Sequence, residues 1–133
     1  MLECLILGDS IAVGTAKARP ECFTVAKGGI NSSNWNKEHL GLDLNAKTVI
    51  ISLGTNDTKA VHTREELEKL RKKVEAGRVF WIMPPIKPEI QDIVKDIANE
   101  YRDQIITISQ DKLSGDKIHP TPKGYKEIGE QAR

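Results

Sequence analysis

The stretch that decides the fold is Ile6-Leu7-Gly8-Asp9-Ser10-Ile11-Ala12-Val13-Gly14. An apolar run stops at the first glycine, and a short segment that can be helical follows the serine. A buried strand that ends in a glycine turn and opens a helix leaves the Ser10 hydroxyl at the carboxyl edge of a sheet. Backbone N–H groups of the new helix surround that hydroxyl and favour an anion there. We therefore interpret Ser10 as a nucleophile.

On the C-terminal side of this stretch, apolar and β-branched runs alternate along the chain with amphipathic segments. The predicted strands cover residues 2–7, 22–25, 48–53, 78–83 and 105–108. Helices are predicted over 11–17, from about 31 to 40, after a capping box at Thr63–Glu66, from Pro88 through Tyr101, and from Thr121-Pro122 onward. Gly77 is predicted to close the third of these helices.

Strands that alternate with helices favour a parallel sheet with right-handed crossovers. We predict an α/β fold, a flavodoxin-like three-layer α/β/α sandwich whose five parallel strands have the order 2-1-3-4-5. The chain of 133 residues is long enough for one domain, which we expect to span residues 1–133.

Composition argues against a nucleic-acid-binding protein and against a membrane-spanning one. The 20 basic and 19 acidic residues are well mixed and leave a net charge of +1, so we expect no nucleic-acid partner. No apolar run approaches the ~20 residues of a membrane span, and no signal peptide precedes the first strand, so we expect a cytoplasmic protein. Cys4 and Cys22 are predicted to be buried thiols in a reducing compartment, in preference to a disulfide or a metal pair.

The conspicuous polar residues follow the predicted strands, at their carboxyl ends. Ser10 follows the first strand, Gly28-Gly29 the second, Asn56 the third, and Asp116 with His119 the fifth. Periodicity placed the strands without using these residues. Their convergence on one sheet edge therefore predicts a functional site there.

The same residue types can carry out acyl transfer. Ser10 can attack, and His119 can take its proton and return it to the leaving group. Asp116, three residues earlier, can orient the imidazole, and Pro120 restricts His119 to extended conformations. The Ser10 N–H, a glycine N–H from the turn after the second strand and the Asn56 amide are candidate oxyanion donors.

Each residue also has a purely structural interpretation. Ser10 could be only a helix N-cap, Asn56 a turn former, and His119 an ordinary loop histidine. Asp9 is expected to cap its turn, and Asp57 to stabilise the turn after the third strand. It is much less expected that four residues with purely structural roles gather by chance on one sheet edge than that they form a functional site.

Gly8-Asp9-Ser10, the glycines at 28–29, Gly54-Thr55-Asn56-Asp57 and Asp116-x-x-His119-Pro120 together resemble the SGNH hydrolases, also called the GDSL esterase/lipase superfamily. The resemblance runs over nearly the whole chain in the family's order. It implies a serine esterase that needs no metal or other cofactor. It also implies Ser10, Asp116 and His119 as the triad, and Ser10, Gly29 and Asn56 as the oxyanion hole, with Gly28 the second choice to Gly29. It offers a hint of a phage or bacterial source.

The expected activity is hydrolysis of short acyl esters such as acetyl esters, on a small molecule or a polymer. The resemblance leaves carbohydrate acetylesterase, lysophospholipase and thioesterase activities open. The segments between the motifs are too short for a lid, which predicts a shallow, open site. A non-catalytic module that binds carbohydrate or protein is the alternative. A nucleotide or phosphate binder ranks last, since no glycine-rich phosphate loop follows the first strand. The physiological ester and the oligomeric state stay open.

Overall fold

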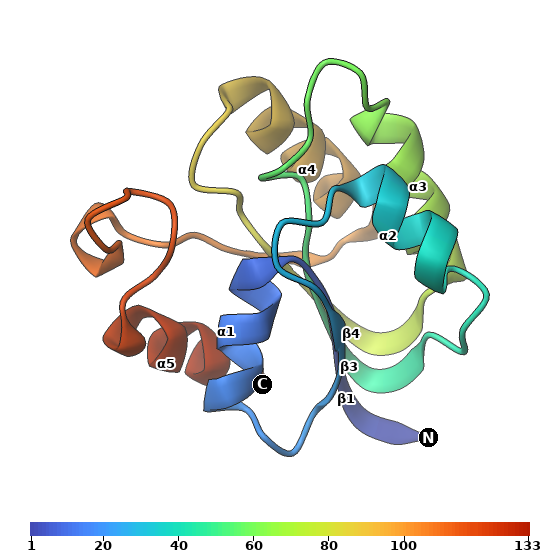
Figure 1. Cartoon of the computed structure of the whole chain (residues 1–133). Helices are drawn as coiled ribbons and strands as arrows, with labels where there is room; N and C mark the ends of the chain where they lie inside the picture. The colour runs from blue at the N-terminus through green and yellow to red at the C-terminus, as the bar shows by residue number, and fades with distance from the viewer.

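The computed structural model describes residues 1–133 as a parallel sheet with helices on both faces (Figure 1). The strands are β1 (Leu2–Gly8), β2 (Phe23–Ala26), β3 (Asn45–Ser52), β4 (Glu75–Ile82) and β5 (Gln104–Ile106). The helices are α1 (Ser10–Ala18), α2 (Ser32–His39), α3 (Thr63–Lys73), α4 (Pro88–Tyr101) and α5 (Pro122–Gln131), with a short 3-10 turn at Gln110–Lys112. The strand order is β2-β1-β3-β4-β5, and every pairing is parallel, so the predicted fold class and topology are confirmed.

Two apolar layers enclose the sheet because alternate strand residues point to opposite faces. Leu5 and Leu7 of β1 belong to the larger core, which also contains residues of α2, α3 and α4. Cys4 and Ile6 belong to the smaller core, together with residues of α1 and α5. The helix pair α1 and α5 therefore covers one face, and the other three helices cover the opposite face.

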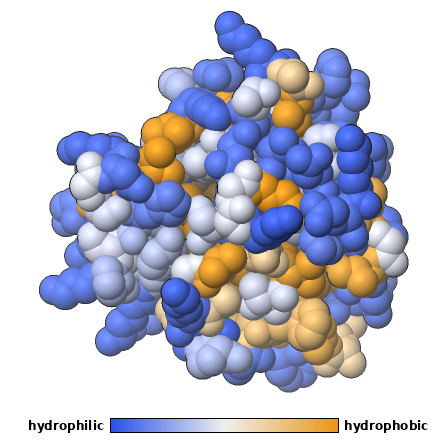
Figure 2. Space-filling view, viewed as in Figure 1, coloured by the Kyte–Doolittle hydropathy of each residue, from blue (hydrophilic) through white to orange (hydrophobic).

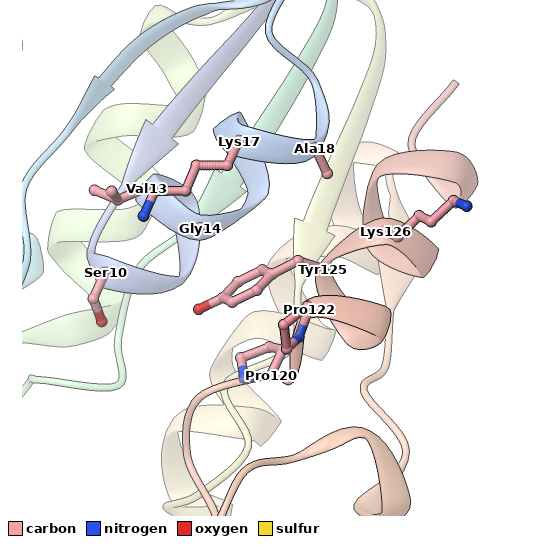
Figure 3. Close-up of a pocket in the computed structure, with 9 residues that line it drawn as sticks. All are labelled: Ser10, Val13, Gly14, Lys17, Ala18, Pro120, Pro122, Tyr125 and Lys126. Carbon is pink, nitrogen blue, oxygen red and sulfur yellow. The ribbon is translucent and has the colours of Figure 1, made fainter.

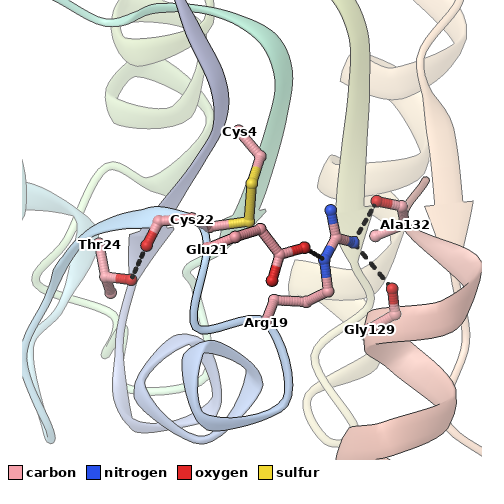
Figure 4. Close-up of a disulfide and its surroundings, with 7 residues drawn as sticks. All are labelled: Cys4, Arg19, Glu21, Cys22, Thr24, Gly129 and Ala132. Carbon is pink, nitrogen blue, oxygen red and sulfur yellow. Dashed lines mark hydrogen bonds and ion pairs between the residues drawn. A yellow bond between two sulfur atoms is a disulfide. The ribbon is translucent and has the colours of Figure 1, made fainter.

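The buried Arg19 side chain links the C-terminal ends of α1 and α5. The Arg19 guanidinium donates to the carbonyls of Gly129 and Ala132 at 2.8 and 2.7 Å (Figure 4). Its Nε also donates to the Glu21 carboxylate at 2.6 Å. A positive charge at the carboxyl end of α5 complements the helix dipole, so this contact stabilises the packing of the two helices.

The prediction of two free thiols is wrong, because Cys4 and Cys22 form a disulfide (Figure 4). The register of β1 and β2 pairs Leu5 with Phe23, which places Cys4 of β1 beside Cys22, the residue that directly precedes β2. Their Cα atoms are 4.8 Å apart, within the range that a disulfide spans. Periodicity predicts strands but not this register. Free thiols were the basis for inferring a reducing compartment, so that argument no longer holds.

One group of side chains is close enough together to hold a metal ion. It consists of Cys4, Glu21 and Cys22, and so includes both sulfurs of the disulfide. Because the disulfide occupies both sulfurs, this cluster offers no thiolate to an ion.

Two local predictions around α3 are also wrong. Thr63 does not cap the helix: His62 holds the N-cap position, and the Thr63 hydroxyl donates to buried Asp57 at 2.8 Å. In a capping box the threonine oxygen would sit at the N-cap and accept from a backbone N–H, whereas here Thr63 is already inside the helix and its hydroxyl donates to a charged acceptor. Gly77 does not close the helix, which ends at Lys73. It lies within β4, where a β-carbon would be 3.1 Å from the Lys47 carbonyl of β3.

Hydrophilic residues predominate on the face shown in Figure 2, with smaller apolar areas between them. The large apolar side chains that are exposed anywhere on the chain are Met1, Leu2, Phe23 and Leu42. No helix has both the length and the apolar character that crossing a bilayer requires.

Candidate active site

Ser10 is the first residue of α1, directly beyond the carboxyl end of β1. Gly8 makes the turn possible: its φ is +144°, and a β-carbon there would be 1.8 Å from the Ser52 carbonyl. Asp9 is the N-cap of α1 and accepts a hydrogen bond from the Ile11 N–H at 3.1 Å. The turn therefore presents the partly exposed Ser10 side chain at the positive end of a helix.

Asp9 is fully buried beneath this turn and stabilises it, as expected. Its Oδ1 accepts from the Ser52 hydroxyl at 3.0 Å as well as from the Ile11 N–H, whereas its Oδ2 has no hydrogen-bond partner. Burial raises the pKa of Asp9 to about 6, although the hydrogen bonds oppose that shift. The Asp9 side chain thus links the turn after β1 to Ser52 of β3 and to the start of α1.

Ser10 Oγ lies 2.8 Å from His119 Nε2, and His119 Nδ1 lies 2.6 Å from Asp116 Oδ2. The hydrogen bond from the imidazole to Asp116 is the main reason that the pKa of this carboxyl lies well below its usual range. The ionised carboxylate can only accept, so Nδ1 carries the ring proton of the neutral imidazole. Nε2 is then free to accept the proton that the Ser10 hydroxyl donates.

The loop that carries His119 is held by its own hydrogen bonds. Asp116 Oδ1 accepts from the backbone N–H groups of Ile118 and His119 and from the Ser114 hydroxyl, at 2.9, 3.0 and 3.0 Å. Ser114 also donates its backbone N–H and its hydroxyl to the His119 carbonyl at 2.7 and 2.8 Å. Asp116 therefore fixes the imidazole through both the ring and the backbone.

Asn56 lies in the turn after β3 and is oriented by the loop that follows β2. Its Nδ2 donates one hydrogen to the Ile30 carbonyl at 3.1 Å, which leaves the second hydrogen of the amide free. Asp57 is buried and accepts from the Ser32 N–H, the Ser32 hydroxyl and the Thr63 hydroxyl, at 2.8, 2.6 and 2.8 Å. Asp57 thus has the structural role expected of it, because it joins the Asn56 turn to α2 and α3.

Lys87 stabilises the turn that contains Asn56, and the glycine pair Gly28-Gly29 lies in the turn after β2. The Lys87 ammonium donates to the carbonyls of Thr55 and Asp57 at 2.7 and 2.8 Å, a contact that the sequence did not indicate. Gly28 lies beside Ser10, since a β-carbon on Gly28 would be 3.9 Å from Ser10 Cβ. Gly29 has a φ of +79° and no neighbour within 4 Å of a β-carbon, so its conformation rather than close packing requires glycine.

A groove of about 680 Å³ opens beside Ser10 between α1 and α5 (Figure 3). Tyr125, Lys17 and Lys126 line it. The sequence patterns described above do not single out any of these three residues. Nothing in the periodicity of α5 indicates that α1 lies opposite.

No protein-family model and no curated protein matches this sequence. Solved structures share its fold. A GDSL-like lipase from Bacteroides thetaiotaomicron superposes with a TM-score of 0.65 at 16% identity, over 99% of this chain and 89% of that one. The C-terminal catalytic domain of the peptidoglycan O-acetyltransferase OatA from Streptococcus pneumoniae gives 0.63 at 19% identity, over 96% and 88%. At these identities the likeness is one of fold.

Proposed function

We propose that residues 1–133 form one SGNH-type hydrolase domain that cleaves acyl esters with Ser10 as the nucleophile. The observation that carries the proposal is the pair of hydrogen bonds that links Ser10 to His119 and His119 to Asp116. The fold shared with a GDSL-like lipase supports it independently of these side chains. No step of the reaction requires a metal or an organic cofactor.

In the first half of the reaction, Ser10 Oγ attacks the ester carbonyl carbon while His119 Nε2 takes its proton. The tetrahedral intermediate collapses, the bond from carbon to the alcohol oxygen breaks, and the alcohol leaves with the proton from His119. The acyl group stays on Ser10. A water molecule then gives a proton to His119 and attacks the acyl carbon. The bond from that carbon to Ser10 Oγ breaks, His119 returns the proton to Oγ, and the carboxylic acid is released. Asp116 stabilises the imidazolium in both halves.

The oxyanion is assigned to three donors, namely the Ser10 N–H, the Gly29 N–H and the Asn56 amide. The hydrogen bond from Asn56 to the Ile30 carbonyl supports this role because it holds the amide before any substrate arrives. The contact of Gly28 with Ser10 keeps Gly28 as the second choice for the glycine donor.

Short acyl groups, acetyl above all, are the proposed substrates, carried either by a small molecule or by a polymer. The connections after β1 and β2 are short, and the long one after β5, residues 107–121, is held beside Ser10 by the hydrogen bond of His119, which supports a site without a separate lid. Rates on a series of p-nitrophenyl esters with two, four and twelve acyl carbons test this part. A clear preference for the twelve-carbon ester would contradict it.

The test of the proposed function is Ser10→Ala, measured with p-nitrophenyl acetate and with a fluorophosphonate probe. We expect hydrolysis and labelling to be lost while circular dichroism and the unfolding midpoint show a folded protein. Ser109→Ala, at an exposed serine whose hydroxyl forms no hydrogen bond within the protein, is the matched control and should keep both. A wild-type protein that neither turns over nor is labelled would favour the carbohydrate- or protein-binding module instead.

A further inference from the structure

The groove between α1 and α5 starts at Ser10 and is far larger than an acetyl group needs. Its volume of about 680 Å³ lies inside the range of roughly 300–1,000 Å³ that is typical of small-molecule sites. Val13, Ala18, Pro120 and Pro122 contribute apolar surface to it. Figure 3 shows Ser10 at one end of this groove.

The Tyr125 side chain lines the groove and contacts the backbone of α1. A β-carbon on Gly14 would be 2.2 Å from Tyr125 Cζ, so only glycine at that position admits the ring. The hydroxyl of Tyr125 forms no hydrogen bond within the protein and points toward the Ser10 end of the groove (Figure 3). Burial, with smaller effects of the Asp9 and Asp116 charges, raises the pKa of this phenol, so the hydroxyl stays a donor at neutral pH.

The charged residues that line the groove are both cations. Lys17 projects from α1 and Lys126 from α5, and no acidic side chain lines the groove with them. Neither ammonium takes part in an ion pair. Lys126 lies at the end remote from Ser10, and Lys17 extends back along α1 (Figure 3). The lining of the groove therefore carries positive charge and no carboxylate, while Glu127 and Glu130 share a separate pocket with Lys126.

The position of the groove decides which half of an ester it receives. The oxyanion donors Asn56 and Gly29 lie in loops that lead to α3 and α2, on the opposite face of the sheet from α1 and α5. His119, which must protonate the leaving oxygen, directly precedes Pro120 of the groove. A carbonyl oxygen directed to the oxyanion donors thus leaves the alcohol on the groove side.

We propose that this groove binds the leaving alcohol of the ester, and that the alcohol carries an anionic group, a carboxylate or a phosphate, which Lys17 and Lys126 attract. This inference rests on the proposed esterase function. It assigns Tyr125, Lys17 and Lys126 to substrate selection rather than to the chemical step. The alcohol departs through the groove with the proton that it receives from His119.

The experiment compares acetyl esters of substituted phenols that carry either an anionic or a neutral group at the far end of the alcohol. The carboxylate arm pairs 4-acetoxybenzoate with the neutral 4-acetoxybenzamide, and the phosphate arm uses 4-acetoxyphenyl phosphate against the same amide. Each kcat/KM is divided by the rate constant of that ester with hydroxide, which cancels intrinsic reactivity. We expect the anionic ester of at least one arm to be favoured about fivefold at low salt, since exposed ion pairs are individually weak.

The variant that tests the assignment is the double change Lys17→Gln and Lys126→Gln. We expect it to abolish the preference for the anionic ester, and raising the salt concentration should reduce the preference in the wild type because exposed charges are screened. Lys123→Gln is the matched control, since this lysine lies on the same helix but does not line the groove, and it should keep the preference.

The outcomes separate this inference from the proposed function. Equal corrected kcat/KM values in both arms, or a preference that survives in the double variant, would overturn the inference while Ser10-dependent hydrolysis still supports the esterase. If Ser10→Ala hydrolyses the neutral amide ester as fast as the wild type, the proposed function fails, and the inference fails with it.

Discussion

The ring of Tyr125 and the α-carbon of Gly14 are in direct contact, although they lie 111 positions apart in the sequence. This contact sets the distance between α1 and α5 and shapes the groove beside Ser10. Gly14 is therefore required for packing even though it lies inside a helix, where glycine costs about 1 kcal/mol relative to alanine.

Gly14→Ala is predicted to destabilise the protein by about 1–3 kcal/mol despite the better helix propensity of alanine, because the new β-carbon displaces the ring. Denaturant unfolding measures this. In a Tyr125→Ala background the same change should cost less, since the two positions are coupled. Gly41→Ala, where a β-carbon meets nothing within 4 Å, is the control. Equal costs in both backgrounds would contradict the contact.

Asp116→Asn is predicted to lower kcat by about 10³- to 10⁴-fold with little change in fold. Asparagine Oδ1 can still accept the backbone hydrogen bonds of the loop, but its amide offers a donor where the carboxylate accepted from His119. The imidazole then favours the tautomer with a proton on Nε2, which cannot take the proton of Ser10. Asp111→Asn, an exposed residue nearby, should keep full activity. A loss of less than tenfold would refute the orienting role.

Asn56→Ala is predicted to lower kcat by about 100- to 1,000-fold, the usual effect of removing one oxyanion donor. KM for p-nitrophenyl acetate should change much less, because the donor acts on the developing charge rather than on the ground state. Asn34→Ala, at an exposed position of α2, controls for the loss of a surface amide. A rise in KM at constant kcat would instead assign Asn56 to substrate binding.

The disulfide is predicted to stabilise the folded chain by about 3 kcal/mol, because it closes a loop between residues 18 positions apart in the unfolded state. Unfolding of the wild type should shift to lower denaturant when dithiothreitol is added. The double variant Cys4→Ala, Cys22→Ala should show the lower midpoint with or without reductant. A wild-type midpoint that reductant leaves unchanged, in a protein shown to be reduced, would contradict this.

Asp9 is predicted to make stability fall as the pH rises from about 4 to 6. Its pKa is 3.8 before and about 6 after burial, so the folded state holds the proton more tightly across that window. Stability is therefore highest below the lower value and is lost as the pH passes the upper one. A shift of about two units corresponds to a loss on the order of 3 kcal/mol.

Asp9→Asn should remove this slope, because the amide keeps an acceptor for Ile11 and Ser52 and does not titrate. The measurement is the free energy of unfolding of both proteins between pH 4 and 7. Ser52→Ala removes one hydrogen bond to the carboxylate and should steepen the slope rather than abolish it. Parallel curves for the wild type and Asp9→Asn would rule out the burial effect.

The sequence alone determined the order of strands and helices, the parallel sheet and the edge where Ser10, Asn56, Asp116 and His119 gather. These features follow from local patterns, since strand and helix periodicities, glycine turns and prolines act over a few neighbouring residues. Three other features became visible only in the tertiary structure. They are the pairing of Cys4 with Cys22, the hydrogen bond from the Thr63 hydroxyl to Asp57, and the groove between α1 and α5. Each of them depends on strand register or on packing between segments that are distant in the sequence. A local pattern predicts a helix or a strand, but not which side chains of another element will contact it.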